Sequence, residues 1–112
     1  MVLRLLDHGF MLVADDRVEI ADGLARAPAG LAGLLEVRGL GLLRLPYAAP
    51  ARLRLAVMLG PAPERLPEPA RHEALDLPLL RLDPARPSAA RIVALALDCV
   101  LGRVPMLAGA FA

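Results

Sequence analysis

The sequence predicts an α/β fold, from three observations along its 112 residues. The apolar run 10–14 has the length of a buried strand. The run 52–59 alternates polar and apolar residues before it becomes fully apolar, as a half-covered strand does when it enters a core. After Ser88, apolar residues follow helical spacing as far as Gly102, which indicates a C-terminal helix that is apolar on most of its circumference and therefore buried. A single domain, 1–112, is long enough to bury such a core.

The composition excludes several classes of function. Charged residues interrupt every apolar run before the roughly 18 residues that a membrane span requires, so we expect no membrane span and a cytoplasmic protein. The single cysteine excludes an internal disulfide and a cysteine-based zinc cluster. All 13 basic residues are arginine, so these residues supply neither a Schiff-base lysine nor a P-loop lysine. A net charge of +1 and only three aromatic residues provide no basic stripe or stacking surface for nucleic acid.

The first elements lead to a pair of carboxylates. The segment 1–9 reads as the last turns of a helix that ends at Gly9. The apolar run 10–14 is then followed directly by Asp15 and Asp16, at the place where open α/β sheets bind ligands. The alternative is that this pair begins a turn.

A hairpin and a glycine-containing segment follow. Asp22 and Gly23 predict a hairpin turn just after the acidic pair. The segment 35–43 places Glu36 and Arg38 inside an apolar run that reads as a buried strand, where unpaired charges would be costly, so we expect them to pair, bind an ion or line a cleft. The alternative is a salt bridge on a solvated face. Two glycines in this run indicate a bend or a close approach of the backbone.

The second half of the sequence contains a loop and a short strand before the C-terminal helix. Four prolines make 60–72 a loop, in which Arg65 is the most notable charge. The run 77–82 reads as a short edge strand, since it contains Pro78, which has no N–H to donate.

Two motifs in this order resemble the HPr(Ser) kinase/phosphorylase family in its C-terminal catalytic domain. The first is 12–20, with its acidic pair; the second matches the family's signature loop and consists of Leu35, Glu36, Val37, Arg38, Gly39, Leu40 and Gly41. Weaker similarity continues through 64–66 and 76–78 to the closing helix. The resemblance implies an α/β fold with a mixed sheet of the HPr kinase and phosphoenolpyruvate carboxykinase P-loop type. It also implies ATP-dependent phosphorylation of a serine of HPr, a phosphocarrier of the bacterial phosphotransferase system, with phosphorolysis as the reverse reaction.

The resemblance also implies roles for single residues. Asp16 matches the acid/base, and Asp15 supports it near the metal. Glu36 matches a ligand of Mg²⁺, a cation that prefers carboxylate oxygen. Arg65 matches the catalytic arginine, and Arg86 an arginine used in phosphorolysis. We therefore expect the carboxylates of Asp16 and Glu36 to approach one cavity, and we expect an HPr-like partner and a homo-oligomer, which in the family is a hexamer.

One family feature has no counterpart in these residues. The Gly-x-x-x-x-Gly-Lys-Ser P-loop that precedes the acidic strand in the family is absent, so we expect the fold to be truncated at its N-terminus and to lack the cradle for ATP. The isolated chain is therefore expected to be inactive as a kinase. The alternative is a truncated, catalytically inactive relative that acts as a protein-binding module.

Overall fold

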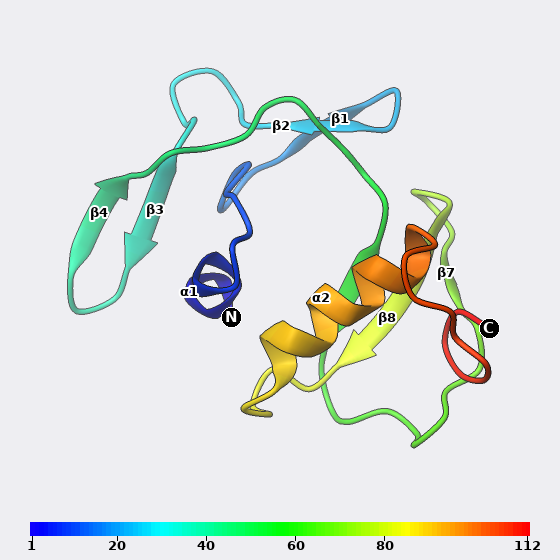
Figure 1. Cartoon of the computed structure of the whole chain (residues 1–112). Helices are drawn as coiled ribbons and strands as arrows, with labels where there is room; N and C mark the ends of the chain where they lie inside the picture. The colour runs from blue at the N-terminus through cyan, green and yellow to red at the C-terminus, as the bar shows by residue number, and fades with distance from the viewer. The chain divides into compact units, whose positions relative to one another are not determined.

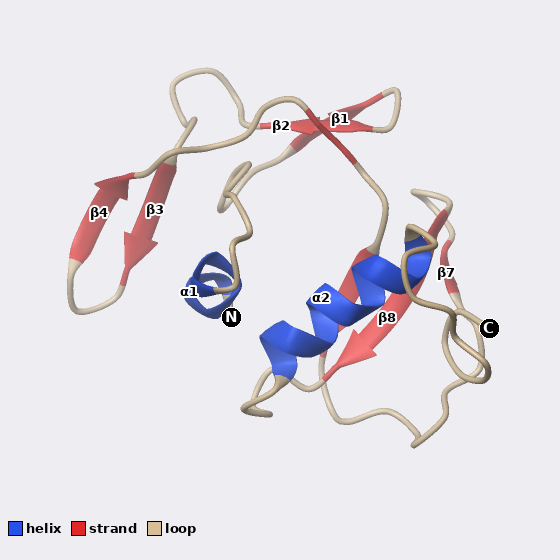
Figure 2. Ribbon diagram, in the orientation of Figure 1, coloured by secondary structure: helices blue, strands red, loops and turns tan.

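The computed structural model describes residues 1–112, and its contacts divide the chain into two compact units (Figures 1 and 2). Unit 1 comprises Met1–His8 and Arg54–Ala112, and unit 2 comprises Gly9–Leu53. The prediction of a single domain stays a prediction. The elements are α1 (Val2–Asp7), β1 (Glu19–Ala21), β2 (Leu24–Arg26), β3 (Leu34–Val37), β4 (Gly41–Arg44), β5 (Ala51–Arg52), β6 (Ala56–Leu59), β7 (Arg71–His72), β8 (Leu77–Leu82) and α2 (Ala89–Val100).

Unit 1 contains a mixed three-stranded sheet in the order β6-β8-β7, which confirms the predicted mixed α/β arrangement. β8 is parallel to β6 and antiparallel to β7, so it is the central strand, and the prediction of an edge strand was wrong. Pro78 is tolerated because it is only the second residue of β8, and the next residue, Leu79, donates its N–H to the carbonyl of Ala70 at 2.9 Å.

The core of unit 1 lies between β8 and α2, which crosses the sheet in Figure 1. Leu80 and Leu82 of β8 lie on one face of the strand and line a cavity with residues of α2, whereas Leu79 lies on the other face, because side chains alternate along a strand. From α2 come mostly small side chains; the buried residues of the two elements are Leu79, Leu80, Leu82, Ala89, Ala90, Val93 and Ala96. The predicted C-terminal helix is present, with Ser88 at its N-cap and Gly102 in the left-handed region after it (φ +78°). It is buried along one face only, since Leu95 is 39% exposed.

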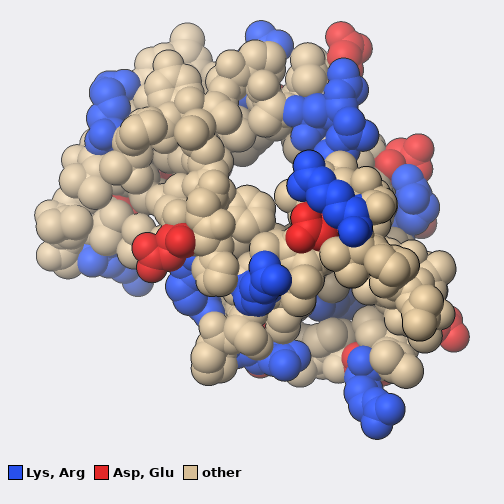
Figure 3. Space-filling view, in the orientation of Figure 1, with Lys and Arg blue, Asp and Glu red and all other residues tan.

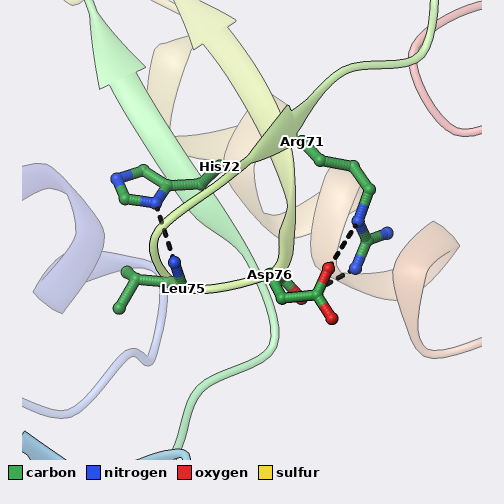
Figure 4. Close-up of polar contacts among 4 residues, drawn as sticks. All are labelled: Arg71, His72, Leu75 and Asp76. Atoms are coloured by element: carbon green, nitrogen blue, oxygen red, sulfur yellow. Dashed lines mark hydrogen bonds and ion pairs between the residues drawn. The ribbon is translucent and has the colours of Figure 1, made fainter.

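Side-chain hydrogen bonds and one ion pair support two places in unit 1: the contact of α1 with the loop before α2, and the turn between β7 and β8. Arg4 of α1 donates to the carbonyl of Arg86 at 2.9 Å and to that of Pro84, which attaches α1 to the loop before α2. In the turn between β7 and β8, His72 Nδ1 accepts the N–H of Leu75 at 3.2 Å, and Arg71 pairs with Asp76 at 3.2 Å (Figure 4).

Unit 2 is built from two hairpins. β1 and β2 join through Asp22 (φ +54°) and Gly23 (φ +73°), which confirms the predicted turn, and β5 completes this antiparallel sheet. β3 and β4 form a separate two-stranded sheet.

Two strand predictions were wrong. The run 10–14 forms only one bridge, between Leu12 and Tyr47, because no other strand lies beside it over a greater length. The run 52–59 is not one strand, because its start, β5, pairs with β2 in unit 2 and its end, β6, pairs with β8 in unit 1. No helix of the structure has the length and apolar character needed to cross a bilayer.

Candidate functional site

Three residues with carboxylate side chains line one cavity in unit 2. Asp15, Asp16 and Glu36 line one cavity of about 190 Å³, whose remaining wall is mostly apolar and consists of Ala14, Arg17, Leu31, Leu34 and Leu42. The structure thus brings Asp16 and Glu36 to one cavity, as we expected from the sequence. Their chemical roles stay predictions.

Backbone contacts explain why two distant segments share this cavity. Leu12, which is 6% exposed, bridges Tyr47, and its carbonyl accepts the N–H of Ala48 at 2.7 Å. The N–H of Leu45 donates to the carbonyl of Gly33 at 2.7 Å, just before β3. The segment before Asp15 and the segment before Glu36 are therefore both bonded to residues 45–48, which follow β4.

Gly33 permits this arrangement. Its φ is +77°, and a Cβ atom there would lie 2.6 Å from the carbonyl oxygen of Leu45 and 2.9 Å from a ring carbon of Tyr47. Only glycine avoids both the left-handed strain and the clash.

The charged residues of β3 and its turn are solvated, contrary to the expectation of buried charges. Glu36 and Arg38 are both exposed and form no ion pair with each other, so neither burial nor a salt bridge explains them. The reason is that β3 pairs only with β4, and such a hairpin covers one face at most; Leu35 is 4% exposed, whereas Leu42, opposite Glu36, is 67% exposed.

The predicted signature loop is the tip of the β3–β4 hairpin. Val37 accepts the N–H of Leu40 at 3.0 Å, and Gly39 and Gly41 adopt φ of +80° and +146°. A Cβ atom at either glycine would meet nothing within 4 Å, so the glycines serve the bend that we predicted and no close approach of the backbone within this chain. A second hollow of about 520 Å³ runs along the tip from Glu36 to Leu42.

The carboxylate oxygens of this cavity suit a hard cation such as Mg²⁺ only if water and substrate complete its coordination shell. No group of three His, Cys, Asp or Glu side chains is placed to hold a metal ion. Mg²⁺ commonly takes one or two carboxylates and completes its shell with water and substrate phosphates. Glu36, as a single carboxylate beside the acidic pair, fits that mode, and the residues do not form a closed metal cage.

The two arginines singled out from the sequence lie in unit 1. Arg65 and Arg86 line one cavity of about 270 Å³ between β8, α2 and the C-terminal segment, and both side chains are exposed. The structure therefore groups the arginines with each other and groups the carboxylates in unit 2.

The sequence reasoning missed some lining residues. Arg17 adds a positive charge to the acidic cavity, and its position directly after the acidic pair was the available signal. Met106 and Phe111 line the arginine cavity, and no motif marks them. On the face drawn in Figure 3, side chains of both signs are present.

A comparison with solved structures relates the fold to a known enzyme. The structure is similar to the HPr(Ser) kinase/phosphatase from Coxiella burnetii, with a TM-score of 0.62 and 19% sequence identity, over 89% of this chain and 74% of that chain. No protein-family model matches the sequence, and no curated protein matches it. The chain therefore has a small α/β fold, with a mixed sheet and a C-terminal helix, that resembles the HPr kinase fold.

Proposed function

We propose that unit 2 carries the acidic part of a phosphoryl-transfer site, which uses ATP and Mg²⁺ to phosphorylate a serine of an HPr-like phosphocarrier. The observation that carries the proposal is the single cavity lined by Asp15, Asp16 and Glu36. The likeness to the fold of the HPr(Ser) kinase/phosphatase supports it.

The residues suit the chemistry in the following roles. Asp16 accepts the proton of the serine hydroxyl while the serine oxygen bonds to the γ-phosphorus and the bond to the ADP oxygen breaks. Asp15 orients Asp16, and Glu36 holds Mg²⁺, which when bound neutralises charge on the phosphates. The exposed tip of the β3–β4 hairpin, next to Glu36, presents the face on which the carrier protein docks.

Within these 112 residues, only arginines can supply positive charge to the phosphates. The 112 residues contain no lysine, so their only permanent side-chain cations are arginines. Arg65 and Arg86 lie in unit 1, and in our proposal they keep the roles that the family resemblance implies: Arg65 in stabilising a phosphoryl group and Arg86 in the reverse phosphorolysis.

A second candidate function is a non-catalytic module that binds the carrier protein. The observation that favours it is that all five candidate side chains, Asp15, Asp16, Glu36, Arg65 and Arg86, are exposed. Exposed groups are poorly shielded from water, and electrostatic catalysis is strongest where water is excluded.

Two measurements on the chain separate these functions. Calorimetry with Mg²⁺-ATP and, separately, with purified HPr measures binding, and labelled ATP measures transfer to HPr. Where the chain transfers phosphate to HPr, Asp16→Asn should lower the transfer rate by about 10²- to 10⁴-fold, because a general base is lost. Asp22→Asn is the matched control: it removes a carboxylate of the same unit at a turn position that asparagine tolerates, and leaves transfer unchanged.

The outcomes have distinct meanings. Binding of HPr without binding of Mg²⁺-ATP shows that these 112 residues do not suffice for the kinase reaction, and it supports the binding module. Transfer that Asp16→Asn leaves intact excludes Asp16 as the base. No binding of either ligand excludes both functions.

A further inference from the structure

The cavity of about 270 Å³ in unit 1 has an apolar floor, which the proposed function does not use. Leu80 and Leu82 of β8, which are 7% and 2% exposed, line it together with Ala96 of α2, which is 5% exposed. These three side chains belong to the core of unit 1, so the cavity reaches from the surface into that core.

The walls of this cavity are apolar as well. Ile92 and Leu95 come from α2, and Met106 and Phe111 come from the C-terminal segment. The N–H of Phe111 donates to Sδ of Met106 at 3.1 Å, which holds the two wall residues of that segment together. An apolar cavity favours a hydrocarbon group over water, because a bound water molecule needs two to four polar partners.

The rim of the cavity is charged and has an excess of one positive charge. Arg65, Arg81 and Arg86 line it together with Glu64 and Asp83. The two ion pairs of the structure join other residues, so none of these three arginines takes part in one. Their guanidinium groups are therefore free to bind an anion, and the planar guanidinium suits a carboxylate in a bidentate manner.

We propose that this cavity binds an aliphatic monocarboxylate, with the hydrocarbon chain against the apolar floor and walls and the carboxylate at the arginines of the rim. At about 30 Å³ for each non-hydrogen atom, the share that a water molecule takes in the liquid, 270 Å³ holds about nine atoms, which points to a chain of about eight carbons. The single excess positive charge favours a carboxylate over a phosphate group, which carries about two negative charges at neutral pH.

This binding site does not depend on the phosphoryl-transfer site proposed for unit 2. Guanidinium groups bind carboxylates and phosphates alike, so a carboxylate and a phosphoryl group could not occupy Arg65 and Arg86 at the same time. Carboxylate binding is therefore measured without ATP and without HPr, and its failure would leave the kinase proposal as it stands.

Methyl NMR of the chain labelled at its four methionines tests the site, with sodium octanoate as the probe. We expect the Met106 signal to shift with a dissociation constant of about 0.1–1 mM, as the usual binding energy per atom gives for a ligand of this size. The signals of Met11 and Met58, which do not line the cavity, should not shift. Butanoate should bind at least about tenfold more weakly than octanoate, because it buries fewer methylene groups.

Octan-1-ol tests the rim, because it has the same hydrocarbon chain without the negative charge. It should bind at least about tenfold more weakly than octanoate, since hydrogen bonds to charged groups are the stronger ones. Arg65→Gln and Arg86→Gln should each weaken the binding of octanoate and leave that of octan-1-ol unchanged. Arg91→Gln is the matched control on α2: this arginine is exposed and does not line the cavity, so both ligands should bind as before.

A larger side chain in the cavity tests its size. Cys99 of α2 lines the cavity, and Cys99→Leu adds two side-chain atoms, so the preferred acid should become shorter by about two carbons. Ala94→Leu enlarges a side chain of the same helix outside the cavity and should leave the preference for octanoate unchanged.

Two results would overturn the proposal: an unshifted Met106 signal at about 10 mM octanoate, and equal binding of octanoate and octan-1-ol. If the variants fail to fold, as circular dichroism would reveal, the comparison of octanoate, butanoate and octan-1-ol on the wild-type chain decides the question.

Discussion

The two units differ in where they place their apolar side chains. In unit 1 the buried side chains are Leu79, Leu80, Leu82, Ala89, Ala90, Val93, Ala96 and Ala110, most of them on β8 and α2. In unit 2 they are only Leu12, Ala25 and Leu35, although this unit carries the acidic cavity and the exposed hairpin tip. The part with the larger core and the part with the candidate carboxylates are thus distinct.

The difference follows from the kind of sheet in each unit. In unit 1 a helix covers one face of a sheet whose central strand is bonded on both sides, and leucines on both faces of that strand are removed from water. Unit 2 contains no helix, and small sheets of two or three strands bury little apolar surface by themselves. Side chains for binding remain exposed there, at the cost of local stability.

Leucine-to-alanine substitution in each unit measures this difference. Leu82 in β8 is 2% exposed and Leu35 in β3 is 4% exposed, so the two leucines are nearly matched in burial. We expect Leu82→Ala to lower the free energy of unfolding by about 3–5 kcal/mol, toward the upper part of the usual range, because packed neighbours surround the cavity that it leaves. Leu35→Ala should cost about 2 kcal/mol, since its surroundings can collapse more easily. Urea denaturation followed by circular dichroism provides both values.

The exposed Leu42 is the control for this pair. It is 67% exposed on β4, and Leu42→Ala should change the free energy of unfolding by less than about 0.5 kcal/mol. Equal losses for Leu35→Ala and Leu82→Ala would show that the two units bury their leucines equally well, and would remove the basis of the comparison.

A glycine pair tests how tightly unit 2 is held around its cavity. Gly33 and Gly30 have similar left-handed φ values, +77° and +81°, but only at Gly33 would a Cβ atom clash with neighbours. We expect Gly30→Ala to cost about 1–2 kcal/mol from backbone strain alone, and Gly33→Ala to cost about 1–3 kcal/mol more from overpacking. Hydrogen exchange of the amides in β3 and β4, measured on both variants, gives the local cost. Equal effects would mean that the stretch from Leu45 to Tyr47 yields readily and does not hold the cavity.

The sequence predicted the local elements of this structure better than their partners. The Asp22-Gly23 hairpin, the bend at Gly39 and Gly41, and the C-terminal helix after Ser88 all depend on backbone preferences of a few adjacent residues, and all are present. Whether the run 10–14 forms a strand, and whether β8 lies at the centre or the edge of its sheet, depends on which distant segments lie beside them. The composition of a single segment does not show which segments those are.

The candidate site shows the same limit. Asp15, Asp16 and Glu36 meet in one cavity because Leu12 bridges Tyr47 and Gly33 bonds Leu45, contacts that no motif encodes. The sequence left open whether Glu36 is buried or lies on a solvated face. An apolar run with two charges forms a buried strand when it has a partner strand on each side. It forms a solvated hairpin when it pairs only with the next strand of the chain, as β3 does with β4.

The smallest effects are expected at the turn between β7 and β8, where a bond to the backbone can be compared with a surface ion pair. His72 is partly buried, and its Nδ1 accepts the N–H of Leu75, so His72→Ala leaves that donor without its acceptor and should cost about 1 kcal/mol. Arg71 and Asp76 are 56% and 89% exposed in their side chains, so their attraction is screened by water. Asp76→Ala is not a clean test because Asp76 has a φ of +52°. Arg71→Ala adds no such strain; it removes the pair together with the exposed 2.7 Å bond that Arg71 donates to the carbonyl of Asp76, and it should cost less than about 0.5 kcal/mol. Urea denaturation in low and high salt separates the contribution of the His72 hydrogen bond from that of the ion pair, since only the ion pair weakens with salt. A larger loss for Arg71→Ala than for His72→Ala would show that this ion pair, and not the histidine, holds the turn that leads into the central strand of unit 1.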